Sequence, residues 1–187
     1  MTPFLFVTGN PNKLEEARRV LGPGVEAVAL ELPEIQSLDL RAVLEAKADE
    51  AWRRVGRMVV VEDVSLETAA WAGLPGPFIK FQLERMGAEG MARAAIAADR
   101  EAGRPEAEWG ATVVRSGLLL RDGERRVFAE GVVSGRLVAP PRGQQGFGFD
   151  PVFEPMGETR TFAELDPAEK DRLGHRGRAW RALAHQL

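Results

Sequence analysis

The chain has 187 residues, a length that fits one domain or a two-lobed domain around a shared core. It contains no cysteine, which excludes disulfides, zinc–thiolate sites and cysteine nucleophiles. The formal net charge of −3 argues against a dedicated nucleic-acid-binding protein, because such proteins usually display a broad basic face. A small anionic ligand bound by a few converging cations remains compatible with this charge.

The apolar segments of the sequence are short. The first seven residues hold no basic segment ahead of an apolar run. No later stretch approaches the roughly 20 apolar residues that span a bilayer. We therefore expect a soluble cytoplasmic protein without a membrane partner.

Strands and helices alternate early in the chain, and an antiparallel pair of strands follows. In chain order, periodicity and capping residues predict a strand at residues 4–7, helices at 11–21 and 38–55, a strand at 58–61, helical segments around 77–86 and 88–98, strands at 110–120 and 125–138, and a closing helix after residue 166. Asn10 and Pro11 suit the start of the first helix, and Asp122-Gly123 is a hairpin signal. The pattern predicts an α/β fold with a mixed sheet.

The segment TGNPNK, residues 8–13, joins the first strand to the first helix. The first amides of a helix are unpaired donors with partial positive charge, so this place suits a phosphate, and Lys13 adds a full charge. The same residues also make an ordinary capped helix with a solvated lysine. Taken alone, the segment favours that second interpretation.

Glu62 and Asp63 stand where the predicted strand at residues 58–61 ends. In open α/β sheets the carboxyl ends of strands border the ligand crevice, and an acidic side chain there can hold a metal. Adjacent residues of a strand point to opposite faces, so we expect only one of the two to enter a given site. The alternative is a strand end that meets water.

The segment GFGFDP, residues 146–151, suits neither a helix nor a strand interior. Aromatic rings beside glycine backbone form a stacking surface for a flat base, and the acid and amides can read the edge of that base. The alternative is a loop that fills the core. Lys170, His175 and Arg176 lie in a basic stretch that is otherwise typical of a solvated helix face near a C-terminus.

Together these segments resemble the inosine triphosphate pyrophosphatase family, also described as Ham1-like nucleotide pyrophosphatases. The similarity runs nearly end to end, with elements in the order TGNPNKLEEARRVL at the start, LPEIQ at 32–36, VEDVSLE at 61–67, GLPGPFIKF at 73–81, GFGFDPVFEP at 146–155, FAEL at 162–165 and AEKDRLGHRGRAWRAL at 168–183. Any one of these motifs is weak. All of them in the same order at similar spacing are a strong signal.

The resemblance implies the residues of a site. Those that would bind the triphosphate are Thr8, Gly9, Asn10 and Lys13, with added charge from Lys47, Lys80 and Lys170. Those that would serve Mg²⁺ are Glu34 and Asp63, and Asp63 is also the implied base that activates water. Those that would frame the base are Phe147, Gly148, Phe149 and Asp150, while His175 and Arg176 would read its oxygenated edge.

The resemblance also implies a fold and a reaction. The fold is a single domain over residues 1–187, an elongated mixed sheet flanked by helices in two lobes with a central nucleotide cleft, usually as a homodimer. The reaction is attack of water on the α-phosphorus of 6-oxo purine nucleoside triphosphates (ITP, dITP and XTP), which releases monophosphate and pyrophosphate and removes non-standard purines from the nucleotide pool. Positioning and charge neutralisation dominate such chemistry.

Four positions depart from the family pattern. Val64 replaces a hydroxyl-bearing residue, so a hydroxyl contact there is lost and a backbone contact remains available to the substrate. Gly174 replaces the usual serine before the His-Arg pair, and Phe149 replaces a more frequent Tyr or Trp. Lys47 lies one residue further from Glu34 than expected.

Three other functions remain open. The chain could hydrolyse pyrimidine or other modified nucleotides, which a substrate panel would reveal. It could be a nucleotide sensor without turnover, against which Glu34 and Asp63 speak. It could be a nucleic-acid-binding module, which the net charge disfavours.

Lysine is rare in this arginine-rich chain, and the only lysines are Lys13, Lys47, Lys80 and Lys170. Exposed positions should therefore tolerate arginine well. The remaining lysines are candidates for places that need a compact ammonium rather than a planar guanidinium. Chance placement is the alternative.

Overall fold

The structure is a computed structural model that describes residues 4–187. The helices are α1 (Pro11–Leu21), α2 (Leu40–Val55), α3 (Ile79–Glu101), α4 (Pro167–Leu173) and α5 (His175–Ala184). The strands are β1 (Leu5–Val7), β2 (Glu26–Val28), β3 (Val59–Thr68), β4 (Pro75–Gly76), β5 (Ala111–Asp122), β6 (Arg125–Leu137) and β7 (Phe153–Pro155). The prediction that the first seven residues hold no basic segment ahead of an apolar run includes residues 1–3, which lie outside the described residues.

The strands form a seven-stranded sheet in the order β2-β1-β3-β5-β6-β7, with β4 paired to β3. β1 runs parallel to β2 and β3, whereas β4 and β7 run antiparallel to β3 and β6. The predicted α/β class with a mixed sheet is therefore confirmed. From residue 4 onward, no helix is long and apolar enough to cross a membrane.

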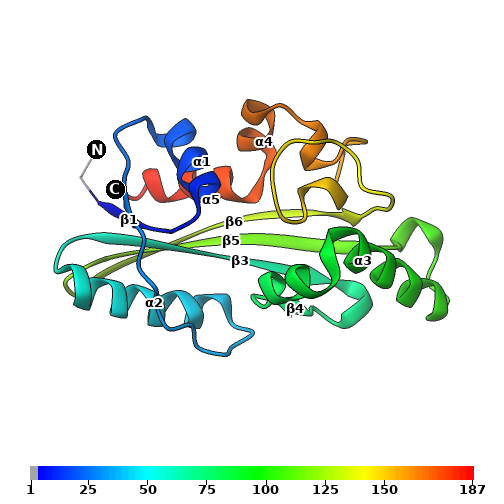
Figure 1. Cartoon of the computed structure of the whole chain (residues 1–187), viewed down its shortest axis with the longest axis horizontal. Helices are drawn as coiled ribbons and strands as arrows, with labels where there is room; N and C mark the ends of the chain where they lie inside the picture. Colours follow the sequence, from blue (N-terminus) through cyan, green and yellow to red (C-terminus); the bar gives the residue numbers. More distant parts are fainter. Residues whose placement is uncertain (1–3) are drawn as a thin grey trace. The chain divides into compact units, whose positions relative to one another are not determined.

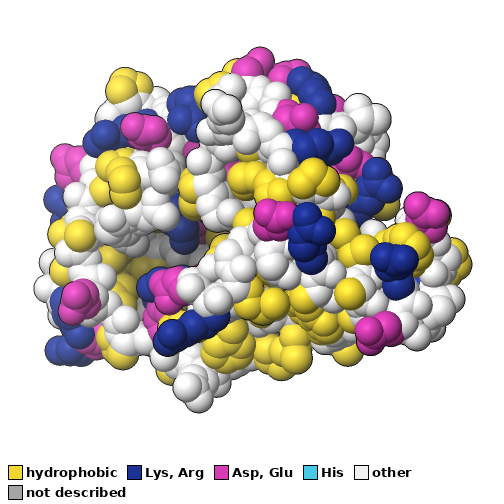
Figure 2. Space-filling view, turned by 45° about the vertical axis from the view of Figure 1, so that its right-hand side comes forward, with side chains coloured by type: hydrophobic (Ala, Val, Ile, Leu, Met, Phe, Trp, Pro, Cys, Tyr) yellow, Lys and Arg dark blue, Asp and Glu magenta, His cyan; other side chains and the backbone are white. Residues whose placement is uncertain are grey.

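The chain divides into two compact units. The first contains the described residues up to Val64, together with Arg115–Gly131 and Asp171–Leu187, and the second contains Ser65–Val114 and Val132–Lys170. β3, β5 and β6 each contribute residues to both units. The two-lobed domain with a central cleft stays a prediction. On the face that Figure 2 shows, acidic and basic side chains are interspersed, in line with the small net charge.

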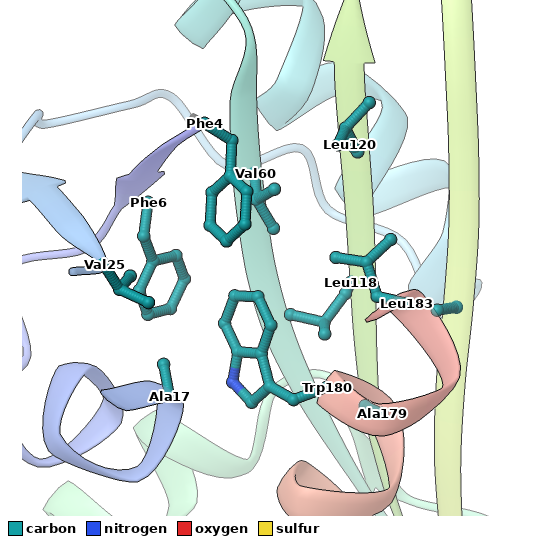
Figure 3. Close-up of a cluster of buried hydrophobic side chains, with 11 residues drawn as sticks. Phe4, Phe6, Ala17, Val25, Val60, Leu118, Leu120, Ala179, Trp180 and Leu183 are labelled. Atoms are coloured by element: carbon teal, nitrogen blue, oxygen red, sulfur yellow. The ribbon is translucent and has the colours of Figure 1, made fainter. Parts of the chain in front are cut away.

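Helices cover both faces of the strands in the first unit. α1 and α5 lie on one face and α2 lies on the other (Figure 1). Trp180 of α5 meets Phe6 of β1 edge-on at 4.9 Å between ring centroids, and Val60 of β3 packs in the same cluster (Figure 3). Val59 and Val61 pack instead with α2. Alternation along β3 thus assigns odd-numbered and even-numbered residues to different faces.

The second unit has an aromatic core of its own. Phe153 lies at its centre, with ring centroids 5.0 Å from Phe162 and 6.1 Å from Phe149. Asp99 near the end of α3 is buried and accepts a hydrogen bond from the Gly110 amide at 2.8 Å. A buried carboxylate with a fixed donor of this kind pins α3 to the start of β5.

β3 continues to Thr68 and does not end at Glu62 and Asp63, so this predicted boundary was wrong. Both carboxylates have cationic partners, Arg176 for Glu62 and Lys47 for Asp63. A charged side chain that is paired in this way can stay inside a strand. Partners so distant in sequence leave no mark in the local pattern.

Caps and glycines set the other boundaries that differ. α2 begins at Leu40, not at residue 38, because the Asp39 side chain caps its first amides. The two helical segments predicted after residue 77 both fall in α3, which Gly87 kinks with a φ of 69°. The closing helix is divided into α4 and α5 at Gly174, whose backbone is extended.

Candidate active site

The turn between β1 and α1 is a side-chain-capped helix start, as predicted. The Asn10 side-chain oxygen Oδ1 accepts hydrogen bonds from the backbone amides of Asn12 (3.0 Å) and Lys13 (3.4 Å). The Thr8 hydroxyl accepts one from the Asn10 amide at 3.1 Å. A Cβ at Gly9 would meet only the Ala29 Cβ, at 3.7 Å, so folding alone does not require glycine there. An anion at this turn would therefore compete with Asn10 for the amides.

Three site residues predicted from the family resemblance form one ionic group, which we call the Lys47 cluster: Lys47, Glu34 and Asp63. The Lys47 ammonium donates to Glu34 Oε1 at 2.8 Å and to Asp63 Oδ2 at 3.0 Å. Burial lowers the pKa of Lys47, but the charge of Asp63 and the bond and charge of Glu34 outweigh it, so the pKa lies above its ordinary value. Lys47 is therefore a full cation between two carboxylates.

The donor set of the Lys47 cluster fits a divalent cation. Glu34 and Asp63 already converge on one positive charge, and carboxylate oxygens are the ligands that Mg²⁺ prefers. Within residues 4–187, no group of three or more His, Cys, Asp or Glu side chains has metal-binding geometry. A cation at Glu34 and Asp63 would therefore need water or substrate oxygens to complete its shell, which is the usual situation for Mg²⁺.

A second ionic group, which we call the Arg176 cluster, consists of Arg176, Glu16 and Glu62. Arg176 donates through Nε to Glu62 at 2.7 Å and through Nη1 to Glu16 at 2.5 Å. Burial lowers the pKa of Arg176, but the charges and hydrogen bonds of Glu62 and Glu16 raise it above the usual range. The guanidinium stays charged inside the unit.

Glu62 is the hub of the Arg176 cluster. Its Oε1 also accepts from the Ser116 hydroxyl at 3.0 Å, and its Oε2 lies 3.7 Å from the Lys13 ammonium. Glu62 has the parity of Val60 on β3, so it faces α1 and α5, whereas Asp63 faces α2. The two adjacent acids thus point to opposite faces of β3, as expected, and each belongs to its own cluster.

The sequence interpretation missed Glu16 and the role of Glu62. Glu16 lies off the apolar stripe of α1, so its burial leaves no periodic signal. The partner of both acids, Arg176, follows in sequence by 160 and 114 positions. Its neighbour His175 is also buried, at the start of α5. A Cβ on Gly131 would lie 2.0 Å from the His175 carbonyl oxygen, so this glycine lets α5 approach β6.

The second unit holds the remaining predicted residues. Asp150 Oδ2 accepts from the Lys170 ammonium and from the Phe147 amide, both at 2.7 Å. Lys170 lies 5.0 Å over the Phe147 ring, and both Asp150 and Lys170 are buried. A Cβ on Gly146, whose φ is +76°, would lie 2.2 Å from Asp150 Oδ2, so glycine is required for this arrangement.

Two other predicted residues, Phe149 and Lys80, belong to the same unit. Phe149 is buried and packs edge-on against Phe153. Lys80 is exposed in the first turn of α3. The predicted site residues therefore fall into groups within each unit, and the roles assigned to them stay predictions.

Comparison with known proteins identifies the family. The sequence model of the Ham1 family matches residues 4–186. The chain belongs to the Ham1 family. It is 37% identical to the dITP/XTP pyrophosphatase of Thermococcus kodakarensis over 97% of this chain and 95% of that protein. It is 36% identical to the inosine triphosphate pyrophosphatase of Aspergillus oryzae over 95% and 89%.

Solved structures of Ham1 proteins share the fold. The HAM1 protein from Coxiella burnetii matches with a TM-score of 0.81 and 25% identity, over 100% of this chain and 98% of that one. The dITP/XTP pyrophosphatase from Mycobacterium abscessus matches with a TM-score of 0.72 and 32% identity, over 100% and 99%. The resemblance inferred from the motifs is confirmed.

The structure shows the surroundings of two positions that depart from the family pattern, Val64 and Gly174. In this Ham1-family chain, the Val64 amide donates to Asp63 Oδ1 at 2.8 Å, so the backbone group at position 64 orients the carboxylate. Gly174 is the N-cap residue of α5 and makes no side-chain cap. Glycine there leaves the first amides of α5 without the hydroxyl acceptor that a serine would supply.

Proposed function

We propose that this chain is a nucleoside triphosphate pyrophosphatase that hydrolyses ITP, dITP and XTP to monophosphate and pyrophosphate. Relatives with these activities in their names match it over nearly its whole length. At the level of residues, one observation supports the proposal: Glu34 and Asp63 both form ion pairs with the ammonium of Lys47. These are the two carboxylates that the family resemblance pairs around a metal.

The first unit supplies the groups proposed for the phosphate chemistry. Glu34 and Asp63 would hold Mg²⁺, which neutralises charge on phosphate oxygens when it is bound. Asp63 is the proposed base for the attacking water, and its Oδ1 is oriented by the Val64 amide. Lys13, in the first turn of α1, and Lys47 would bind the phosphates of the leaving pyrophosphate.

Base recognition is proposed to use donors. His175 and Arg176, at the start of α5, are proposed to read the oxygenated edge of the base, and N–H groups of this kind are donors that suit an oxo group. A 6-amino group would direct a donor toward donors, and sites built on hydrogen bonds discriminate by about 10⁴ against such a mismatch. ATP is therefore expected to be a poor substrate.

A panel of nucleoside triphosphates with Mg²⁺ tests the proposal, with pyrophosphate and phosphate scored separately. We expect pyrophosphate and monophosphate from ITP, dITP and XTP, and little product from ATP. Phosphate release with accumulating diphosphate would place the cleaved bond elsewhere. Binding of ITP without any product would favour a sensor, and faster turnover of pyrimidine nucleotides would favour the related pyrophosphatases.

The family resemblance also leads us to propose a cytoplasmic homodimer. Sedimentation equilibrium of the purified chain tests the assembly, with a mass near twice the 20.5 kDa of one chain expected. A single-chain mass at micromolar concentration would contradict it.

A further inference from the structure

Lys47 occupies the position between the two carboxylates proposed as metal ligands. Its ammonium lies 2.8 Å from Glu34 Oε1 and 3.0 Å from Asp63 Oδ2. Lys47 projects from α2, whose Leu44, Ala48 and Ala51 are fixed in the core. The backbone of α2 is therefore held in place, and the ammonium can leave only by rotation of its own four-carbon stem.

A divalent cation and the Lys47 ammonium compete for the same anions. Two positive charges that both contact Glu34 and Asp63 would lie only a few ångströms apart, so each weakens the binding of the other. Each oxygen of Asp63 already accepts a hydrogen bond, Oδ1 from the Val64 amide and Oδ2 from the Lys47 ammonium. Binding of a metal thus requires Lys47 to withdraw or costs the metal much of its affinity.

Lys47 can withdraw because its cluster is open. The Glu34 side chain is 47% exposed, so the ion pair between Glu34 and Lys47 contributes little net stability and costs little to break. By comparison, the ion pairs of Lys170 with Asp150 and of Arg176 with Glu62 are buried. A withdrawn lysine still needs an anion, and the phosphates of a nucleotide supply one.

We propose that Lys47 is the internal counterion of the metal site: it holds Glu34 and Asp63 together in the metal-free protein, yields its place to a divalent cation, and transfers its charge to the phosphates of the nucleotide. This rests on the proposed function, in which Glu34 and Asp63 bind the metal. Metal and nucleotide are then thermodynamically coupled through one side chain. Free metal binds weakly, and nucleotide strengthens it because the phosphates accept the displaced ammonium.

The first experiment measures Mn²⁺ binding without nucleotide, by the loss of the free-Mn²⁺ electron paramagnetic resonance signal. Mn²⁺ has the oxygen-ligand preference of Mg²⁺. Lys47→Met should bind Mn²⁺ at least about tenfold more tightly than the unchanged chain, a typical size for a coupling of this kind. Lys47→Gln is measured in parallel and should shift in the same direction, so a folding defect of one variant does not decide the result.

The matched control is Arg41→Met on the same helix. Arg41 pairs with the exposed Glu45, and its substitution removes the same charge without touching Glu34 or Asp63. Mn²⁺ affinity should change by less than about twofold, as for an ordinary surface substitution. Asp63→Asn should abolish the tight Mn²⁺ site. Equal or weaker Mn²⁺ binding by folded Lys47→Met and Lys47→Gln would overturn the proposal.

The second experiment repeats the titration with a non-hydrolysable ITP analogue. Nucleotide should strengthen Mn²⁺ binding to the unchanged chain by at least about tenfold, and this gain should largely disappear in Lys47→Met. An undiminished gain in Lys47→Met would overturn the transfer of charge to the phosphates. Pyrophosphate release from ITP by the unchanged chain is scored separately. Its absence would defeat the proposed function while the Mn²⁺ titration without nucleotide still decides the role of Lys47.

Discussion

Two ionic clusters lie on opposite faces of β3 and differ in burial. In the Arg176 cluster, the side chains of Arg176, Glu16 and Glu62 are 4%, 7% and 1% exposed. In the Lys47 cluster, those of Lys47, Glu34 and Asp63 are 12%, 47% and 19% exposed. Each consists of one cation between two carboxylates, so chemical type does not distinguish them.

Burial decides what each cluster can do. Charges removed from water must be fully paired, so the Arg176 cluster cannot lose a member without a large penalty. Its partners are therefore fixed, and it acts as a rigid frame that joins α1, β3 and α5. Charges that still reach water exchange partners at little cost, which suits the Lys47 cluster to binding. Acids adjacent in sequence thus have different tasks.

The largest expected effect is on stability, from Arg176→Met. This change leaves two buried carboxylates without their counterion, and breaking a buried pair costs about 3–5 kcal/mol. The free energy of unfolding in urea at neutral pH measures it. A loss similar to that of an exposed control such as Arg93→Met, whose partner is Glu89 on the surface of α3, would show that the Arg176 cluster is not the frame inferred here.

The second effect separates activity from stability at the two adjacent acids. Asp63→Asn removes the proposed base, so pyrophosphate release from ITP should fall by about 10²-fold or more, with little change in unfolding free energy. Glu62→Gln should lower stability more and turnover less than Asp63→Asn does. The reason is that it weakens the ion pairs of residue 62 with Arg176 and Lys13. Equal losses of turnover in both variants would contradict the division of tasks.

A third effect concerns the size of the cation. Lys13→Arg, at the edge of the Arg176 cluster, and Lys170→Arg, sealed beside Asp150, each replace an ammonium by a larger planar fork. We expect kcat/KM for ITP to fall about tenfold in each, which corresponds to about 1.4 kcal/mol. Arg93→Lys is the matched control in the reverse direction and should keep full activity. Full activity in both lysine variants would remove the argument from lysine rarity.

The smallest effect is the stability change of Lys47→Met. Because the Lys47 cluster is partly exposed, the free energy of unfolding of Lys47→Met should be lower than that of the unchanged chain by no more than about 1 kcal/mol. Urea unfolding of this variant beside Arg176→Met gives the comparison directly. A drop as large as that of Arg176→Met would mean that the open cluster is as structural as the sealed one.

Features with a local cause were predictable from the sequence. Asn10 and Pro11 located the start of α1, and Asp122-Gly123 located the hairpin between β5 and β6. Alternation along a strand correctly placed Glu62 and Asp63 on different faces. The family resemblance named Glu34 and Asp63 together; both pair with Lys47, and their role as metal ligands stays a prediction.

Features with a distant cause were not predictable. β3 runs through its acidic pair because Arg176 and Lys47 neutralise it, and neither lies near it in sequence. The arginine-rich composition did not reveal that Arg121 is buried over the Trp52 ring and paired with Asp49. Composition reports how often a residue type occurs and carries no information about where a given copy packs.

Because side chains alternate along β3, the number of residues that precede Glu62 in the strand decides which face its side chain occupies. One residue inserted before Glu62 within the strand would turn every following side chain to the opposite face. Glu62 would then point toward Lys47, and Asp63 would point toward Arg176, although the composition of the chain is nearly unchanged. Insertions or deletions of odd length at residues 59–61 thus exchange the sealed acid for the open one, whereas those of even length preserve the phase.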